Sequence, residues 1–299
     1  MIMKPFFSII VPTYNRADLI KKTLDSLLAQ QYEHFEIIVV DDGSTDNTEE
    51  IVGAIKDLRI AYYKKNNAER AAARNFGAAL AKGDFVNFFD SDDIALPNHL
   101  QEAAVLISKH EQIDWFHLAY AWANPDAVVF KKVNQFKGET LNKIMASGNP
   151  LSCNGVFIKK ELMLQHPFNE ERALSASEDY ELWCRLAARY PLYYSNTITS
   201  LVIDHDLRSV RTIQGEKLIQ RLELLIQFLE ADKQTVAYFG KRFEQIKMDA
   251  NSYIALHLAN EPRYKLTSIQ YLCKALFDSV SLLQTKRFYA TLKNILIKW

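Results

Sequence analysis

The chain has 299 residues, 48% of them hydrophobic and 24% charged, which is enough for one large α/β domain and a helical appendage. This composition excludes a disordered or fibrous protein. The 36 basic and 36 acidic residues cancel, so the net charge gives no reason to expect a nucleic-acid partner.

The cysteines and the apolar runs bear on the compartment. Cys153, Cys184 and Cys273 lie far apart with no C-x-x-C spacing, so neither a zinc site nor a disulfide framework is predicted. This pattern is typical of a reducing compartment, and we expect a cytoplasmic protein. No uncharged apolar run approaches the roughly 20 residues that a membrane-spanning helix needs. Any membrane association would therefore be peripheral.

The first part of the chain alternates strand-like and helix-like segments. Apolar runs predict strands at Phe6–Val11, Phe35–Val40, Arg59–Tyr63 and Phe85–Phe89. Helical spacing predicts a helix after each of the first three strands, the first two capped at Asn15 and Asp46. Because strands that alternate with helices pair side by side in one direction, we expect a mainly parallel sheet.

The pattern changes further along the chain. Between Pro97 and about Phe157 it mixes a helix with strand-like runs at Trp115–Trp122 and Val128–Val133. Beyond Arg211 it is almost wholly helical, and basic residues outnumber acidic ones. We therefore predict an α/β domain over residues 1–210 and a helical C-terminal region over residues 211–299.

Three polar clusters follow strands of the predicted sheet. They are Val11-Pro12-Thr13-Tyr14-Asn15, Asp41-Asp42-Gly43-Ser44 and Asp90-Ser91-Asp92-Asp93. Because ligands of open α/β sheets bind at the carboxyl ends of the strands, we expect these clusters to meet in one cleft. The second cluster, taken alone, is better explained as a turn with a helix cap.

The third cluster is harder to explain as a turn. Its three carboxylates repel one another unless a cation or a hydrogen-bond donor relieves them. Carboxylate oxygens are hard ligands that suit Mg²⁺ or Mn²⁺, and a site with few protein ligands leaves room for the diphosphate of a donor. The cluster therefore predicts a divalent-cation site suited to nucleotide-sugar chemistry.

In this order, the motifs resemble those of family 2 glycosyltransferases of the GT-A fold, over about residues 6–210. The resemblance implies a Rossmann-like domain that transfers a sugar, with inversion, from a nucleotide diphosphate donor to a hydroxyl acceptor. The donor is by implication a UDP-sugar. The residues that would line its nucleotide pocket are Pro12, Thr13, Tyr14, Asn15 and Arg16. Asp42 would bind the base, and Arg74, in Ala73-Arg74-Asn75-x-Gly77, would lie near the base or the diphosphate.

The same resemblance assigns residues to the ribose, the metal ion and the phosphates of the donor. Asp90-Ser91-Asp92 is similar to the DXD motif, in which Asp90 would meet the ribose or the metal shell and Asp92 would hold Mn²⁺ or Mg²⁺. His205 would be a further metal ligand and Arg208 a phosphate contact; the alternative for both is a polar loop leaving the last strand. Glu69-Arg70 departs from the family pattern, and its role is left open.

A second acidic motif supplies the catalytic candidates. Ser177-Glu178-Asp179-Tyr180-Glu181-Leu182-Trp183 resembles the ED motif, which makes Glu178 and Asp179 catalytic and Asp179 the base. A base is chemically required, because a sugar hydroxyl is a poor nucleophile near neutral pH until a carboxylate accepts its proton. The run also reads as the capped first turn of a helix, and the two interpretations are compatible.

The sequence also bears on other functions. The chain has neither the G-x-G-x-x-G of a dinucleotide-binding oxidoreductase nor the G-x-x-x-x-G-K-[ST] of a P-loop phosphotransferase. A nucleotidyltransferase would need a basic triphosphate loop after the first strand, where only Arg16 stands. A catalytically inactive sugar-nucleotide or carbohydrate-binding protein is a further alternative, which donor hydrolysis would separate from an enzyme. The commonest setting for such enzymes is bacterial polysaccharide or glycolipid synthesis, with a glycan or glycolipid acceptor.

The C-terminal end has its own pattern. From Ser279 to Trp299 there are four basic residues, Lys286, Arg287, Lys293 and Lys298, and no acidic residue. Phe288, Leu292, Ile295 and Trp299 fall on one helical face. Such a helix either lies in the interface of an anionic membrane, on its inner face, or packs against neighbouring helices.

Overall fold

The computed structural model describes residues 4–110, 112–132, 136–137, 141–205 and 215–297. Backbone contacts divide the chain into two compact units. The sheet unit comprises Met1–Leu141, Leu151–Arg172 and Tyr190–Arg208; the helical unit comprises Asn142–Pro150, Ala173–Arg189 and Ser209–Trp299. The boundary near residue 210 stays a prediction, since two segments that precede it, one of them carrying Asp179, group with the C-terminal helices.

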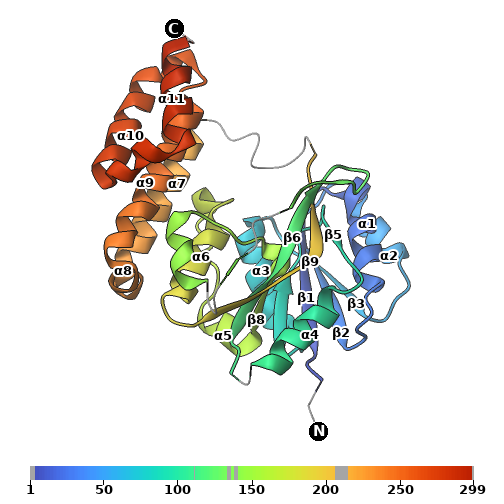
Figure 1. Ribbon diagram of the computed structural model, residues 1–299. Coiled ribbons are helices and arrows are strands. Elements are labelled where there is room, and N and C mark those ends of the chain that lie inside the picture. The colour runs from blue at the N-terminus through green and yellow to red at the C-terminus, as the bar shows by residue number, and fades with distance from the viewer. Residues whose placement is uncertain (1–3, 111, 133–135, 138–140, 206–214, 298–299) are drawn as a thin grey trace. The chain divides into compact units, whose positions relative to one another are not determined.

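Within the described residues of the sheet unit, nine strands form one sheet (Figure 1). The strands are β1 Phe7–Thr13, β2 Phe35–Asp41, β3 Ile60–Lys64, β4 Phe85–Phe88, β5 Ile94–Ala95, β6 Trp115–Ala123, β7 Val129–Lys132, β8 Val156–Lys159 and β9 Leu192–Ile203. Their order is β3-β2-β1-β4-β8-β6-β9-β5, and β7 pairs with β6. The first four strands in this order are parallel, as the alternating pattern predicted, whereas β8, β5 and β7 pair in the antiparallel sense.

Helices pack on both faces of this sheet. They are α1 Ala17–Leu28, α2 Thr48–Ala54, α3 Glu69–Leu80, α4 His99–Lys109 and α5 Lys160–Gln165. Ile9 of β1 shares a core with Leu24 of α1 and Leu100 of α4. Ile10 points to the other face, where a methyl group added to Gly77 of α3 would lie 2.5 Å from its Cγ2 atom. Only glycine at this position lets α3 lie so close to the sheet.

The register of the sheet places the three polar clusters at one edge. Thr13, the last residue of β1, pairs with Asp41, the last residue of β2. The Asp42 N–H then donates to the Thr13 carbonyl at 2.8 Å. On the other side of β1, the Phe89 N–H donates to the Ile10 carbonyl at 2.9 Å, immediately before Asp90. Side chains that are far apart in the sequence therefore leave the sheet from neighbouring strands.

The helix cap predicted at Asn15 is wrong, whereas the Asp46 carboxylate does accept the first N–H of α2, that of Thr48, at 3.1 Å. Neither α1 nor α2 receives a side-chain hydrogen bond from its own N-cap residue. Instead the Asn15 side chain accepts the Thr45 N–H at 2.9 Å, and the Asp46 side chain accepts the Ala17 N–H at 3.0 Å. Asp46 thus satisfies the first N–H groups of both helices, Ala17 of α1 and Thr48 of α2, and together with Asn15 it ties the two loops together.

The described part of the C-terminal region is helical, as predicted. The α-helices of the helical unit are α6 Glu178–Ala187, α7 Gly215–Ala231, α8 Lys233–Phe239, α9 Phe243–Leu258, α10 Lys265–Asp278 and α11 Lys286–Ile297, and its short 3₁₀ helices include η1 Asn142–Ser147. Helix α9 packs against α7, α10, α11 and η1, and α6 packs against α7 and η1. The unit is thus built around α9.

Helix α11 contains most of the basic C-terminal segment. Ile295, from the predicted apolar face, is buried, and α11 packs against α9 and α10. The buried Lys265 ammonium donates to the Ile295 carbonyl at 3.0 Å. Trp299, the last residue of the predicted stripe, lies outside the described residues. These contacts agree with the packing alternative. Among the described residues, no helix is long and apolar enough to cross a membrane.

Candidate active site

The end of β1 and the loop after it carry the five residues expected in the nucleotide pocket, which are Pro12, Thr13, Tyr14, Asn15 and Arg16. Thr13 is buried, and 48% of Tyr14 is exposed. Asn15 has a φ of +50°, in the left-handed region that asparagine tolerates better than most residues. Its N–H donates to the Ser44 hydroxyl at 2.9 Å. The loops that follow β1 and β2 are therefore held against each other.

Asp42 is almost fully buried and charge-paired. The Lys65 ammonium donates to its Oδ1 atom at 2.7 Å, and the Ala68 N–H donates to the same oxygen at 2.9 Å. The preceding residue, Asp41, does different work: its carboxylate accepts the Ser44 N–H and the Tyr62 hydroxyl. Burial and this carboxylate raise the pKa of Tyr62. Asp41 therefore stabilises the turn, while Asp42 is buried beside the Lys65 ammonium.

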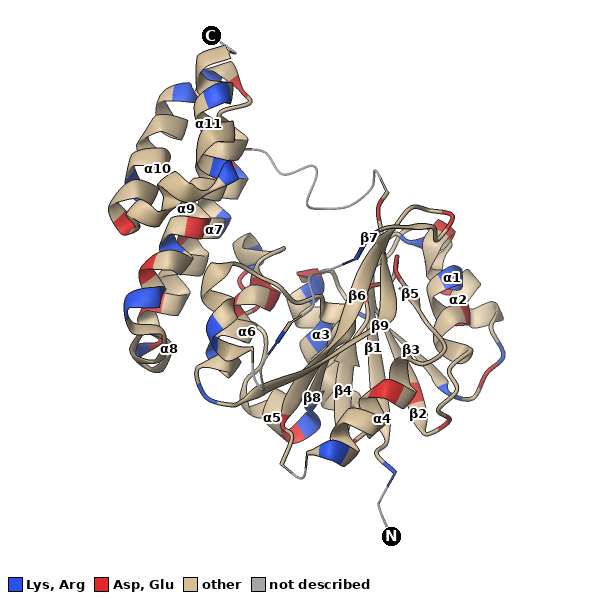
Figure 2. Ribbon diagram, in the orientation of Figure 1, with Lys and Arg blue, Asp and Glu red and all other residues tan. Residues whose placement is uncertain are grey.

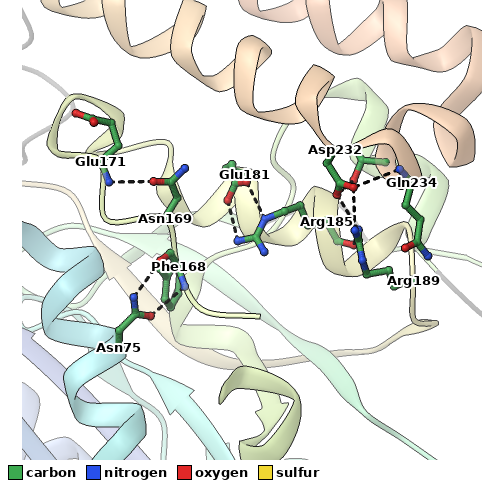
Figure 3. Close-up of polar contacts among 10 residues, drawn as sticks. Asn75, Phe168, Asn169, Glu171, Glu181, Arg185, Arg189, Asp232 and Gln234 are labelled. Carbon is green, nitrogen blue, oxygen red and sulfur yellow. Dashed lines mark hydrogen bonds and ion pairs between the residues drawn. The ribbon is translucent and has the colours of Figure 1, made fainter. Parts of the chain in front are cut away.

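Arg74 and Asp90 form an ion pair. Arg74 is 2% exposed, and its guanidinium donates to Asp90 Oδ1 at 3.0 Å while lying 5.3 Å from the centre of the Phe168 ring. The neighbouring residue on α3, Asn75, exchanges hydrogen bonds with the Phe168 backbone, as Figure 3 shows. The aromatic ring and the carboxylate together fix the direction of the arginine.

Asp92 lies between two basic side chains. His205 Nε2 is 3.1 Å from its Oδ2 atom, and an Arg16 nitrogen is 3.6 Å from the same oxygen. The side chains of all three are at least four-fifths buried. Two of the three predicted metal ligands, Asp92 and His205, are thus brought together. The third, Asp90, is paired with Arg74.

Asp93 has a structural role. Its Oδ2 atom accepts the Asn154 amide at 2.6 Å, and its Oδ1 atom accepts the Ile203 N–H at 2.8 Å. The Asn154 side chain also accepts the Asp90 N–H at 2.8 Å. The repulsion between neighbouring carboxylates is therefore relieved by protein groups, a different partner for each. Ser91, between them, is buried.

These donors determine whether a metal ion fits the site. Among the described residues, no group of three or more His, Cys, Asp or Glu side chains is arranged to hold a cation. Asp92 and His205 nevertheless offer a carboxylate oxygen and an imidazole nitrogen at one point, and both suit Mn²⁺. The pair fits a cation whose remaining ligands come from the substrate. Arg208 lies outside the described residues.

The acidic motif at the start of α6 belongs to the helical unit, and Figure 2 shows acidic residues there. Glu178 is 2% exposed, and its carboxylate accepts the Ala176 N–H at 2.6 Å. Asp179 is half-buried and accepts the Asn149 amide at 3.1 Å. Ser177 occupies the N-cap position but makes no side-chain cap bond, so the Glu178 side chain holds the turn instead.

Ion pairs fix α6 within its unit (Figure 3). Arg185 bonds Glu181 one turn earlier, at 2.7 Å. Arg189, just beyond α6, forms two hydrogen bonds of 2.8 Å to Asp232, the residue that caps α8. Burial alone would raise the pKa of Asp232, but bonds from Arg189 and Thr235 lower it to about 2. The helix that carries Asp179 is therefore rigidly held.

Three polar side chains of these groups were not predicted: Lys65, Asn149 and Asn154. They lie 23, 30 and 61 residues from the carboxylates they contact, Asp42, Asp179 and Asp93. No spacing rule connects such pairs. The backbone marks the candidate site more clearly than residue spacing does, because Asn15, Glu69 and Ala176 all have left-handed φ angles beside the candidate residues.

The chain was compared with known proteins. The family described as "Glycosyl transferase family 2" matches residues 8–143. An uncharacterized glycosyltransferase of Rickettsia felis is 31% identical over 213 residues, 65% of this chain, and the chain spans 33% of that protein's length. The UDP-Glc:alpha-D-GlcNAc-diphosphoundecaprenol beta-1,3-glucosyltransferase WfgD of Escherichia coli is 34% identical over 177 residues, 59% of this chain and 67% of WfgD.

The fold is also found in solved structures. S. aureus TarS 1-349 in complex with UDP-GlcNAc superposes with a TM-score of 0.71 at 24% identity, covering 97% of this chain and 88% of that one. The predicted GT-A fold is thereby confirmed, including the helical C-terminal region. Because WfgD matches over two thirds of its own length and the family match covers the strands that carry Asp42, Asp90 and Asp92, the chain belongs to glycosyltransferase family 2.

Proposed function

We propose that this glycosyltransferase transfers a sugar from a UDP-sugar to a hydroxyl of a glycan or glycolipid acceptor, with inversion at the anomeric carbon. The observation that carries the proposal is the edge formed by β1, β2 and β4, where Asp42, Asp90 and Asp92 follow the strands and each has a basic partner, Arg74 of α3 being that of Asp90. The names of WfgD and of the TarS complex support uridine nucleotides and, for WfgD, a lipid diphosphate acceptor.

The donor would be held by this edge. Asp42 Oδ1 is engaged by Lys65 and Ala68, and we assign Oδ2 to the N3–H of uracil. Asp90 would bind the ribose. Arg74 and Arg16 would offset the charge of the diphosphate, since both guanidinium groups are largely buried, where their charges act more strongly than in water.

Asp179 would act on the acceptor. Its carboxylate takes the proton of the attacking hydroxyl as the new bond to the anomeric carbon forms and the bond to the diphosphate oxygen breaks. Asn149 holds this carboxylate through a neutral hydrogen bond that leaves its charge intact. A displacement of this kind with one base inverts the configuration.

A divalent cation, Mn²⁺ or Mg²⁺, would be held by Asp92 and His205. When bound, it would offset the negative charge that grows on the leaving UDP. Arg16, 3.6 Å from Asp92, would then turn its charge toward the diphosphate. Cytoplasmic location and peripheral membrane contact stay predictions.

The experiment that tests the proposal is calorimetry of UDP binding with and without Mn²⁺. Asp92→Asn removes a hard anionic ligand and keeps the size of the side chain, so metal-dependent UDP binding is expected to weaken strongly. Asp93→Asn removes the same negative charge from the neighbouring aspartate and is the matched control. This variant is expected to be less stable, because Asp93 accepts hydrogen bonds from Asn154 and Ile203. Equal UDP affinity of wild type and Asp92→Asn with Mn²⁺ present would refute the metal assignment. Release of UDP from UDP-glucose separates an enzyme from an inactive binding protein.

A further inference from the structure

Lys65, the first residue after β3, belongs to none of the motifs described above, but the sheet places it in the candidate site. In the register of the sheet, Lys64 at the end of β3 pairs with Asp41 at the end of β2. The Lys65 N–H then donates to the Asp41 carbonyl at 2.9 Å. This backbone hydrogen bond holds Lys65 beside the end of β2, within reach of Asp42.

The contact between Lys65 and Asp42 is mostly shielded from water. The Lys65 ammonium lies 2.7 Å from Asp42 Oδ1, and the two side chains are 19% and 5% exposed. Water and salt weaken an ion pair at the surface, whereas a shielded pair is held more strongly. The position of the ammonium is therefore defined before any ligand binds.

Asp42 is itself held from both sides. Its N–H donates to the Thr13 carbonyl at 2.8 Å, and the Asn67 amide donates to its carbonyl at 3.0 Å. Asn67 is fixed in turn by Arg172, whose guanidinium donates to its backbone and side-chain oxygens at 3.1 and 3.2 Å. The pair of Lys65 and Asp42 is therefore a rigid part of this edge of the sheet.

Both partners keep hydrogen-bonding capacity that the protein does not use. An ammonium has three N–H groups. Those of Lys65 donate to Asp42 and, at 2.9 Å, to the Asn66 carbonyl, which leaves one without an acceptor among the described residues. Asp42 Oδ1 accepts Lys65 and the Ala68 N–H, whereas Oδ2 accepts no hydrogen bond from a described residue and is not fully enclosed. The pair thus presents a donor next to an acceptor.

A donor next to an acceptor matches the pairing edge of uracil. This edge carries a carbonyl oxygen, O4 or O2, on either side of the N3–H group. A carboxylate oxygen can therefore accept N3–H while an ammonium beside it donates to one of the carbonyl oxygens. Both hydrogen bonds involve a charged group of the protein, and such bonds are the stronger ones.

The order of the strands decides which carbonyl oxygen the ammonium meets. The strands β3, β2, β1 and β4 are neighbours in this order, with Lys65 after β3, Asp42 after β2 and Asp90 after β4. With the ribose at Asp90, as proposed above, the base extends from the side of β4 toward β3. O2 lies next to the ribose, and O4 lies at the far end of the pairing edge. Lys65 therefore faces O4.

We propose that Lys65 is a specificity-determining residue of the nucleotide site: its ammonium donates to O4 of uracil while Asp42 Oδ2 accepts N3–H. The inference rests on the proposed binding of the base at Asp42 and of the ribose at Asp90. Cytosine has a lone pair at N3 and an amino group at C4. It would place an acceptor against the carboxylate and a donor against the ammonium, and leave both charged groups unpaired. The pair thus distinguishes two bases of equal size.

The first test is calorimetry of UDP and CDP binding to the full chain with Mn²⁺ present. Wild type is expected to bind UDP more tightly. Lys65→Met is expected to lower UDP affinity by about tenfold to a hundredfold and CDP affinity far less, because only uracil loses a bond to a charged donor. Lys64→Met is the matched control. It removes the same charge from the adjacent residue, whose ammonium bonds the exposed Glu49 at 2.8 Å, and is expected to keep the preference for UDP.

The second test changes the ligand. In 4-thio-UDP a sulfur atom, a weaker acceptor, replaces O4, and 2-thio-UDP carries the same change at O2. Wild type is expected to bind 4-thio-UDP less tightly than UDP and to bind 2-thio-UDP like UDP. In Lys65→Met the penalty for sulfur at position 4 is expected to vanish, since the donor is gone. If Lys65 only stabilised Asp42, this penalty would be the same in wild type and variant.

The outcomes separate this inference from the proposed function. Equal losses of UDP and CDP affinity in Lys65→Met would indicate a contact with the diphosphate and overturn the proposal, as would a penalty for sulfur that the variant keeps. If Lys65→Met does not fold, wild type decides, because equal affinities for UDP and 4-thio-UDP exclude the bond to O4. A preference for UDP that survives in Lys65→Met refutes the role of Lys65 alone. A wild type that binds CDP as tightly as UDP refutes the uridine nucleotide as well.

Discussion

Two histidines buried in the sheet unit predict that the protein loses stability in mild acid. Burial lowers the pKa of His117 to about 3, and burial together with the charge of His117 does the same for His99. In an unfolded chain a histidine has a pKa of about 6.5. Between these values the unfolded state binds protons that the folded state does not, so stability falls as the pH falls. The loss at pH 5, relative to pH 8, is about 2 kcal/mol for each histidine.

The pH range of this loss lies above the range in which aspartates paired with a cation lose their contribution to stability. Hydrogen bonds from Arg59 lower the pKa of Asp57 to about 2. The unfolded pKa of an aspartate is about 3.9, so this group loses its contribution only below about pH 4. A loss of stability between pH 7 and pH 5 would therefore come mainly from histidines.

The assay is urea denaturation at pH 8 and at pH 5, followed by circular dichroism. In the variant His99→Asn/His117→Gln, the new amides can replace the present bonds to the Thr199 hydroxyl and the Ser152 N–H, but they do not titrate. Its stability is expected to change far less between the two pH values than that of wild type. His34→Gln, at an exposed position, is the control. A double variant with the full wild-type pH dependence would refute the reasoning.

Two further predictions concern the helical unit. Asp179→Asn is expected to abolish transfer and leave UDP affinity nearly intact, because a base acts mainly in the transition state; kinetics and calorimetry check this. Proton NMR of the product should show an inverted anomeric centre, and retention would exclude a single-base mechanism. Deletion of Lys286–Trp299 is expected to unfold this unit, because it removes the Ile295 carbonyl that the buried Lys265 contacts. A truncated protein that stays folded and no longer sediments with anionic liposomes would favour the membrane interpretation.

Much of the sheet could be predicted because its sequence obeys local rules. The buried strands β1, β2 and β4 are mostly apolar runs that polar residues follow. The positions of the later strands could not be predicted, because β8 enters the sheet between β4 and β6 from far along the chain. The cap at Asn15 failed for a related reason. Asn15 has the right chemistry for a local bond, but its side chain instead accepts the Thr45 N–H of the other loop, while Asp46 accepts both the Thr48 N–H of its own helix and the Ala17 N–H of α1.

In the candidate site, too, residues that stand in local motifs could be predicted from the sequence, whereas their partners from distant segments could not. The carboxylates Asp42, Asp92 and Asp179 could be chosen from the sequence, since each stands in a motif next to a strand or a helix start. Their counter-charges could not, because a cation is recognised as a partner only when the fold brings it close. Lys65 reaches Asp42 across the edge of the sheet.

The burial of Arg221 could not be predicted from any sequence motif. In the sequence it is one basic residue of an amphipathic helix, and such residues usually point to solvent. In the fold it is buried, and its Nε and Nη1 atoms have no hydrogen-bond partner within the described residues. Burying a charged group with unpaired nitrogens lowers stability, so the fold marks Arg221 as unusual where the sequence does not. Whether a charged residue of an amphipathic helix lies in solvent or in the interior is therefore decided by tertiary packing, which the helical pattern alone does not encode.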